Sequence, residues 1–305
     1  MKAFFVFSGQ GAQTVGMGKD LYDNIPAARA VFDEADRVLG YSLTDVIFNG
    51  PIEKLTSSIY CQDAIYTVSC AAYAAFEAKF GSITPVACAG LSLGEYGALC
   101  CGKAFDFATG AKLLAERGKL MDAACQEADG AMASVLGGDP AVIAQACKEA
   151  DIDVANYNCP GQIVISGERS KLEKAVALLK EQGLRKVIVL NVAGAFHSRM
   201  MQSAGDGLAK VLETADIKLP EVPVYHNFTA DTAKSVEELK ENLARQVAGS
   251  VRWEECLRRA AAAGADTVIE FGPGSVLTGL AKRTDSTLKL ININSAASLD
   301  AAELN

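Results

Sequence analysis

The pentapeptide at residues 90–94, Gly-Leu-Ser-Leu-Gly, constrains the fold more than any other stretch of the chain. It follows an apolar run at residues 86–89 and precedes a helix-prone stretch that begins at Glu95. A tight turn from strand to helix leaves no room for a Cβ atom two residues before or after the serine, so glycine occupies both positions. Gly-x-Ser-x-Gly in this context predicts a nucleophile elbow that presents the Ser92 hydroxyl above the end of a sheet. The alternative is a glycine-rich turn without chemistry.

Apolar runs alternate with helical patterns along most of the sequence, which predicts an α/β fold with a parallel sheet. Strands are expected over residues 3–7, 86–89, 222–226, 267–271 and 288–293. Ser235 and Glu238 have the spacing of a capping box, which predicts the start of a helix. A second helix is expected over residues 253–263, ended by Gly264.

The middle of the chain departs from this alternation. Its pattern predicts strand, helix, two strands, helix and strand, over residues 131–136, 140–150, 154–157, 163–166, 169–182 and 186–190. This β-α-β-β-α-β order is that of a ferredoxin-like split motif. We therefore expect a large domain formed by residues 1–128 and 195–305, interrupted by a small domain at residues 129–194.

Composition and charge narrow the function classes. The chain has 305 residues, 50% of them hydrophobic, so a sizeable core can form without disulfides. Its 9 cysteines are scattered without a Cys-x-x-Cys pair, which favours reduced thiols and a cytoplasmic location. Residues 1–10 lack the basic region of a signal peptide, and no apolar run approaches the length of a membrane span. A formal net charge of -8 argues against nucleic-acid binding.

Two nucleotide-binding motifs are excluded in the glycine-rich stretch after the first expected strand. Thr14 stands where the dinucleotide fingerprint requires its third glycine. A phosphate-binding loop would need glycine in place of Gln13 and serine or threonine in place of Asp20.

A serine nucleophile needs a base, and the chain contains two histidines, His197 and His226. His197 lies where the predicted small domain rejoins the large one, and junctions between domains often form clefts. His226 ends the expected strand at residues 222–226. We therefore favour His197 as the base, with His226 as the second candidate and a hydrogen-bonded structural histidine as the alternative for each.

Arg117 lies in the middle of an apolar stripe on a helix expected to begin near Asp106. The apolar members of that stripe are Leu113, Leu114, Leu120, Met121 and Ala124. An unpaired guanidinium at such a position is costly. Two explanations remain open. The side chain forms an internal salt bridge or reaches outward to solvent, or its guanidinium binds a substrate carboxylate.

Several motifs occur together in an order typical of one family. They are Phe-Ser-Gly-Gln-Gly-Ala-Gln at 7–13, Gly-Leu-Ser-Leu-Gly-Glu-Tyr at 90–96, Arg-Gly at 117–118, Asn-Cys-Pro-Gly-Gln at 158–162, Ala-Phe-His-Ser at 195–198 and Phe-Gly-Pro-Gly at 271–274. On these motifs essentially the whole chain resembles the malonyl-CoA:acyl carrier protein transacylases, and it is similar to the acyltransferase domains of polyketide synthases. The resemblance implies an α/β-hydrolase-like large domain with an inserted ferredoxin-like small domain.

The resemblance also implies roles for side chains. Ser92 would be the acylated nucleophile, His197 its base, and Arg117 the residue that binds the malonyl carboxylate. Phe196 is similar to the residue found before the histidine in malonyl-selective members, whereas methylmalonyl-selective relatives tend to have serine there.

Backbone groups would complete the site that the resemblance implies. The N–H groups of Gln10 and Leu93 would form an oxyanion hole, and the carbonyl of Gln246 would orient the histidine. The chain departs from the usual family pattern at two positions, with Leu91 in place of histidine and Ser8 in place of proline.

The activity implied by the resemblance is transfer of a malonyl group from malonyl-CoA to the phosphopantetheine thiol of acyl carrier protein, through a malonyl-serine ester. It implies a cytoplasmic protein, expected to be a monomer, that acts in fatty-acid synthesis without a cofactor or metal and contacts neither membrane nor nucleic acid. Alternatives that stay open are a polyketide acyltransferase, a serine thioesterase or other hydrolase, and a non-catalytic subunit that keeps the fold.

Overall fold

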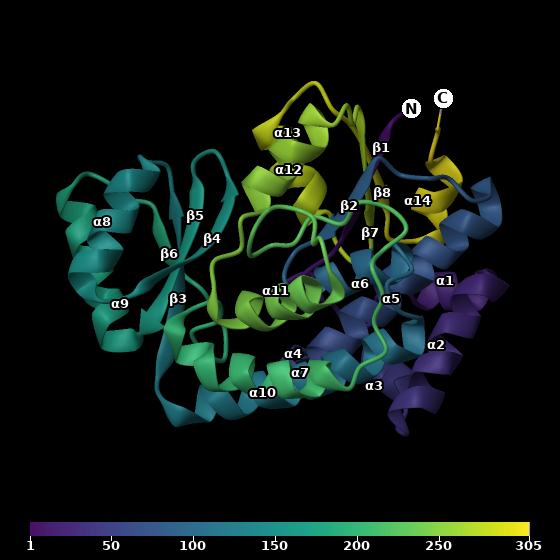
Figure 1. Cartoon of the computed structure of the whole chain (residues 1–305), viewed down its shortest axis with the longest axis horizontal. Helices are drawn as coiled ribbons and strands as arrows, with labels where there is room; N and C mark the ends of the chain where they lie inside the picture. The colour runs from purple at the N-terminus through teal and green to yellow at the C-terminus, as the bar shows by residue number, and fades with distance from the viewer. Residues whose placement is uncertain (305) are drawn as a thin grey trace.

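The computed structural model describes residues 1–304 and contains two sheets with helices packed around them (Figure 1). The strands are β1 (Ala3–Phe7), β2 (Ala87–Gly90), β3 (Gly130–Leu136), β4 (Asp153–Cys159), β5 (Gln162–Glu168), β6 (Val187–Val189), β7 (Thr267–Phe271) and β8 (Lys289–Ile293). The helices are α1 (Lys19–Asn24), α2 (Pro26–Leu39), α3 (Leu43–Asn49), α4 (Ile52–Thr56), α5 (Ser58–Phe80), α6 (Gly94–Cys101), α7 (Phe107–Glu127), α8 (Pro140–Ala150), α9 (Arg169–Glu181), the 3₁₀ helix η1 (Arg199–Met201), α10 (Gln202–Glu213), α11 (Val236–Ala248), α12 (Trp253–Ala262), α13 (Val276–Thr284) and α14 (Ala296–Ala301). Among the described residues, no helix combines the length and apolar character needed to cross a membrane.

The main sheet has the strand order β2-β1-β7-β8, and every neighbouring pair is parallel. All five residues of β1 are buried, since Phe4 and Val6 pack into one hydrophobic cluster while Phe5 and Phe7 pack into another. A sheet covered on both faces takes continuous apolar runs rather than alternating ones, which is the pattern that predicted these strands. The predicted parallel α/β sheet is therefore confirmed.

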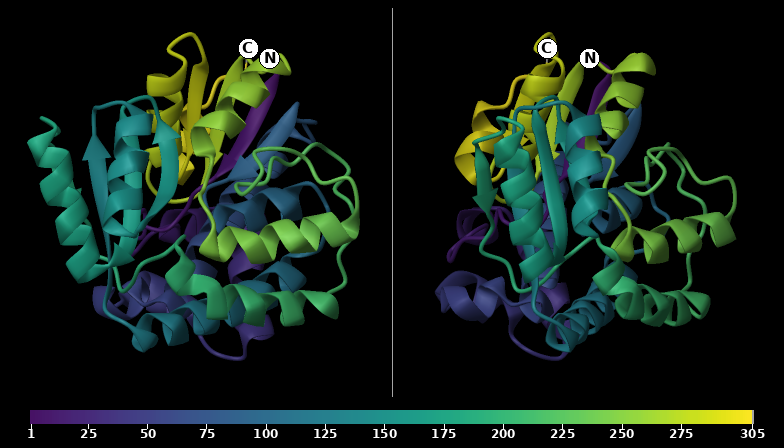
Figure 2. Two further views of the ribbon diagram at one scale, coloured as in Figure 1. Left: turned by 60° about the vertical axis from the view of Figure 1, so that its left-hand side comes forward. Right: turned by 90° about the vertical axis from the view of Figure 1, so that its left-hand side faces the viewer.

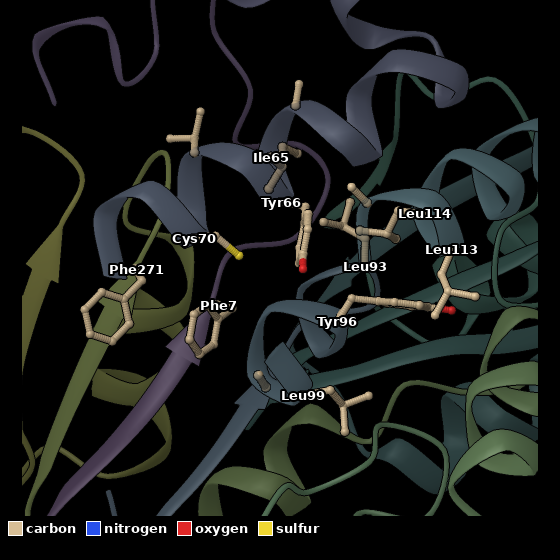
Figure 3. Packing of buried hydrophobic residues seen from close by; sticks show 14 of the residues in the cluster. Phe7, Ile65, Tyr66, Cys70, Leu93, Tyr96, Leu99, Leu113, Leu114 and Phe271 are labelled. Carbon is tan, nitrogen blue, oxygen red and sulfur yellow. The ribbon is translucent and has the colours of Figure 1, made fainter. Parts of the chain in front are cut away.

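Aromatic rings join the main sheet to the long helix α5. The ring of Phe271 on β7 lies 5.1 Å from that of Phe5 and 5.2 Å from that of Phe76, centroid to centroid. Figure 3 shows Phe7 and Phe271 close together, with Tyr96 of α6 and Leu113 of α7 further along the same cluster. This packing fixes α5, α6 and α7 against the end of the sheet where the glycine-rich pentapeptide lies.

The small sheet has the order β4-β5-β3-β6, and its neighbouring strands are antiparallel. Helices α8 and α9 pack together against it, burying Ile143 and Leu172 with Val135 and Ile165 of the strands (Figure 2). The chain order of these elements is β-α-β-β-α-β, as the sequence predicts.

A short backbone pairing connects the small sheet to the chain that follows α11. The Tyr157 N–H donates to the Val251 carbonyl at 2.9 Å, and the Val251 N–H donates to the Ala155 carbonyl at 2.8 Å. Val251 thus forms an isolated parallel bridge with Asn156 of β4. The sequence pattern does not predict this link, because one paired residue has no periodicity to detect.

Residues 222–226 do not form the predicted strand, and this expectation is wrong. Only Val224 pairs, as an isolated bridge to Cys88. Pro223 has no N–H to donate, and the chain turns immediately afterwards, with the Ala230 N–H bonded to the His226 carbonyl at 2.7 Å. The apolar run there reflects burial of a loop against β2.

The capping box at α11 is confirmed in part. The Ser235 hydroxyl accepts a hydrogen bond from the Glu238 N–H at 3.2 Å. Glu238, however, accepts from the N–H of Lys234 at 2.8 Å, one residue earlier than a reciprocal capping box requires.

Replacing Phe271 with alanine should lower the free energy of unfolding by about 3–5 kcal/mol, because a fully buried ring is removed from the ring cluster between sheet and helix. Denaturant titration followed by circular dichroism gives the measurement. Phe80→Ala is the matched control, since that ring is only partly buried and pairs with Phe76 at 5.1 Å. Similar decreases in the free energy of unfolding for both variants would contradict a special contribution of the buried Phe271 ring.

Candidate active site

The turn between β2 and α6 has the predicted form of a nucleophile elbow. Ser92 adopts the left-handed conformation with φ 55°, directly between Gly90 and Gly94. A Cβ atom at Gly90 would overlap the Gly94 carbonyl, and one at Gly94 would overlap the Phe7 carbonyl of β1. The strand and helix can approach so closely only with glycine at both positions.

Ser92 is hydrogen-bonded to His197, the histidine favoured as its base from the sequence. The Ser92 Oγ lies 2.8 Å from His197 Nε2, and His197 Nδ1 lies 2.8 Å from the backbone carbonyl of Gln246. Because a carbonyl only accepts, Nδ1 carries the proton and Nε2 presents a lone pair to the serine hydroxyl. Burial of His197, reinforced by the nearby Arg117 cation, lowers its pKa to about 4. The imidazole is therefore neutral and able to accept the serine proton at neutral pH.

Arg117 of α7 is 1% exposed and reaches the same hydroxyl. Its Nη2 donates to Ser92 Oγ and to Gln246 Oε1, each at 3.0 Å, and its Nη1 donates to Gln62 Oε1. Within residues 1–304 no carboxylate forms an ion pair with this guanidinium, and its Nε has no hydrogen-bond partner. Neither the internal salt bridge nor the outward-reaching side chain considered from the sequence is present. Burial lowers the pKa of Arg117, while Tyr96 and Glu95 oppose that shift.

Gln10 and Leu93, the predicted oxyanion donors, lie on the two loops that meet at the elbow. A Cβ at Gly9 would lie 2.5 Å from the Leu91 carbonyl oxygen, so the loop carrying Gln10 runs directly against the pentapeptide. Leu93 precedes α6, where the helix dipole favours negative charge. In the described part of the chain, neither backbone N–H donates a hydrogen bond. Both are free to face a developing oxyanion.

Asn227 holds the elbow, and sequence reasoning did not single it out. Its Oδ1 accepts from the Ser92 N–H at 2.6 Å, and its Nδ2 donates to the Gly90 carbonyl at 2.8 Å. One side chain therefore binds both sides of the strained turn. An asparagine after a short apolar run is too common to be identified from the sequence alone.

His226, the second candidate base, does not reach Ser92. Its Nδ1 lies 2.7 Å from Glu95 Oε1, and both side chains are buried. Glu95 also accepts from the Asn227 N–H at 2.8 Å and from Gln246 Nε2 at 2.7 Å. The structure thus brings Ser92, His197, Arg117 and Gln246 together and places His226 in a buried polar layer behind the elbow.

A parallel α/β sheet with a serine elbow and a histidine hydrogen-bonded to the serine hydroxyl is typical of enzymes that form acyl-serine intermediates. The family comparison agrees with this class, since residues 4–300 match the acyl transferase domain. The chain belongs to the acyl transferase domain family.

Individual relatives have narrower descriptions. The chain is 41% identical over 306 residues to the malonyl CoA-acyl carrier protein transacylase of Bacillus subtilis (strain 168), covering 99% of this chain and 96% of the relative. An acyl carrier protein S-malonyltransferase from Vibrio cholerae has a TM-score of 0.94 at 38% identity, covering 99% of this chain and 100% of that one. A malonyl-transacylase solved in complex with its type II PKS acyl-carrier protein has a TM-score of 0.95 at 38% identity, covering 99% of each chain. The resemblance and the fold class predicted from the sequence are confirmed.

The depressed pKa of His197 leads to a test that needs no substrate. The second-order rate of Ser92 labelling by a fluorophosphonate should stay nearly constant from about pH 8 to about pH 5.5, because the base stays neutral over that range, and then fall toward pH 4. Labelling is read by intact mass, with circular dichroism at each pH as the control for folding. A histidine with an unperturbed pKa would lose about tenfold in labelling rate by pH 5.5, and such a loss would contradict the lowered pKa of His197.

Proposed function

We propose that this chain transfers a malonyl group from malonyl-CoA to the phosphopantetheine thiol of acyl carrier protein, through an ester on Ser92. The observation that carries the proposal is the Arg117 guanidinium, which is buried, lacks a carboxylate partner within residues 1–304 and lies 3.0 Å from the Ser92 hydroxyl. An acyl group on Ser92 that ends in a carboxylate supplies the missing anion. The names of the relatives support the same donor and acceptor.

In the first half-reaction, Ser92 Oγ attacks the thioester carbonyl of malonyl-CoA and passes its proton to His197 Nε2. The Gln246 carbonyl stabilises the imidazolium through its hydrogen bond to Nδ1. The backbone N–H groups of Gln10 and Leu93 bind the oxyanion. The tetrahedral intermediate then collapses, the carbon–sulfur bond breaks, and the coenzyme A thiol leaves with the proton from His197.

The second half-reaction reverses these roles with a new thiol. The phosphopantetheine thiol gives its proton to His197 and attacks the malonyl ester carbon, and Ser92 leaves with that proton. Atoms and charge balance with the two substrates alone, so no metal or redox cofactor is needed for the reaction as written. The oxyanion donors act in both halves, because the tetrahedral carbon occupies the same place each time.

Arg117 selects the acyl group in this proposal. The malonyl carboxylate is separated from the reacting carbonyl by a single methylene, so it lies near the guanidinium that already contacts Ser92 Oγ. Gln62 and Gln246 hold the guanidinium with neutral oxygens, which leaves its charge available. An acetyl group has no carboxylate to pair with it.

We also propose the domain limits 1–128 and 195–305 for the large domain and 129–194 for the ferredoxin-like insert. The membership of the two sheets supports these limits, since β3 to β6 form the small sheet and the other strands the main one.

We further propose a monomeric, cytoplasmic enzyme of fatty-acid synthesis. A carrier of polyketide synthesis is the alternative acceptor, and kcat/KM with each purified carrier distinguishes them.

Replacing Ser92 with alanine should abolish both the covalent malonyl adduct and transfer, because no ester can form. His197→Ala should slow transfer by orders of magnitude, whereas His226→Ala should cost less, since His226 contacts Glu95 and not the serine. Intact mass after mixing with malonyl-CoA detects the adduct. An adduct that persists in Ser92→Ala would refute the assignment of Ser92 as the nucleophile. Release of free malonate from malonyl-CoA in the absence of carrier protein would indicate a hydrolase.

Arg117→Ala should change the acyl preference rather than activity alone. Loss of a charge-assisted hydrogen bond in a desolvated site costs on the order of 2–5 kcal/mol, so malonyl transfer should fall by a few orders of magnitude while acetyl transfer holds steady or rises. The measurement is kcat/KM for malonyl-CoA and acetyl-CoA in both proteins. A parallel decrease for the two donors would make Arg117 structural.

A further inference from the structure

Glu95 is a fully buried carboxylate in the first turn of α6, three residues after the serine. It accepts hydrogen bonds from His226 Nδ1 at 2.7 Å, from the Asn227 N–H at 2.8 Å and from Gln246 Nε2 at 2.7 Å. The reaction described above does not use this side chain, and it has no hydrogen bond to the Ser92 hydroxyl among the described residues.

Glu95, the Ser92 carbonyl and Arg117 together fix the direction of the Gln246 amide. Its Nε2 donates to Glu95 Oε2 at 2.7 Å and to the Ser92 carbonyl at 3.1 Å, while its Oε1 accepts from Arg117 Nη2 at 3.0 Å. Turning the amide over would set its NH₂ group against the donors of Arg117 and its oxygen against the Glu95 carboxylate. Neither hydrogen bond could then form, because donors would face donors and acceptors would face acceptors.

The position of the Arg117 guanidinium depends on the direction of the Gln246 amide. Its anchors are the oxygens of two neutral amides, Gln62 Oε1 at Nη1 and Gln246 Oε1 at Nη2, together with the Ser92 hydroxyl. If the Gln246 oxygen turned away, Nη2 would keep only the serine hydroxyl as a partner, and Nε already lacks one, so Gln62 alone would hold the rest of the group.

We propose that Glu95 is a positioning residue for acyl-group selection, because its hydrogen bond to Gln246 Nε2 helps to fix the direction of the amide and thereby holds the Arg117 guanidinium beside Ser92. His226 keeps Glu95 in place from the other side. This inference rests on the proposed malonyl transfer. The Gln246 amide lies between Glu95 and the guanidinium, so Glu95 orients Arg117 without taking the place of the substrate carboxylate.

A purely structural role gives a different expectation. Glu95 also binds the backbone of Asn227, whose side chain holds the elbow at Ser92 and Gly90. If that support were its only effect, removal of the carboxylate would disturb the nucleophile and slow every acyl donor alike. Discrimination between malonyl and acetyl donors therefore separates the two roles.

The test is Glu95→Gln, with kcat/KM measured for malonyl-CoA and acetyl-CoA and the holo carrier protein as acceptor. A glutamine has one acceptor oxygen for three donors and adds a donor of its own, so the Gln246 amide is held less firmly in its direction. We expect the malonyl-to-acetyl ratio of kcat/KM to fall by about tenfold or more, the usual consequence of losing a hydrogen bond to a charged group.

Two further variants make the result decisive if Glu95→Gln folds poorly. Gln246→Met keeps the backbone carbonyl that holds His197 but removes the amide, and it should lower the same ratio. Adding Glu95→Gln to Arg117→Ala should leave the malonyl-to-acetyl ratio of kcat/KM as it is in Arg117→Ala alone, because the effect of Glu95 passes through Arg117.

Glu270→Gln is the matched control. Glu270 on β7 is a second fully buried carboxylate, and it accepts from the N–H groups of Leu277 and Thr278 in the first turn of α13 at 3.1 Å and 2.8 Å. Its substitution should affect stability and leave the ratio as in the wild type. Equal decreases for the two donors in both Glu95→Gln and Gln246→Met would overturn the inference. Failure of the wild-type chain to form a malonyl adduct would instead overturn the proposed function.

Discussion

A buried cation surrounded by neutral oxygens is the constraint on which the rest of this structure depends. Removing a guanidinium from water costs several kcal/mol unless hydrogen bonds replace its hydration. Arg117 obtains those bonds from Gln62 on α5 and Gln246 on α11, and the Tyr96 ring of α6 lies 6.0 Å from its guanidinium carbon. Helices far apart in the sequence must therefore meet at one point. That convergence also brings Ser92 and His197 next to the guanidinium, because α6 follows the serine and α11 supplies the carbonyl that binds the histidine.

Both residues expected to exchange a proton have a strained backbone. Ser92 and His197 both have φ 55°, a conformation that costs non-glycine residues about 1–3 kcal/mol each. Fixed partners offset this cost. Asn227 binds both sides of the serine turn, and the Ser198 hydroxyl donates to the Ala195 carbonyl at 2.6 Å across the histidine turn. The two side chains thus meet at hydrogen-bonding distance without having to search through rotamers, which is the preorganisation that electrostatic catalysis requires.

Local patterns in the sequence predicted the parts of the molecule that obey local rules. The elbow follows from glycine sterics, and the small sheet from the order of its strand-like and helical segments. The burial of Arg117 follows from its place within an apolar stripe. The buried polar contacts of Glu95, Asn227 and Gln62 could not be predicted from the sequence, because such contacts between distant elements have no spacing rule. The failed strand at residues 222–226 has a related cause. Burial against β2 produced an apolar run, but Pro223 and the following turn prevented a ladder.

The pairing of Val251 with β4 has a mechanical consequence. Val251 follows Gln246 by five residues, and its hydrogen bonds to Ala155 and Tyr157 tie the small sheet to the segment that anchors the imidazole. A displacement of the small sheet would therefore be transmitted to the carbonyl that orients His197, so the position of the imidazole depends on a sheet outside the serine elbow.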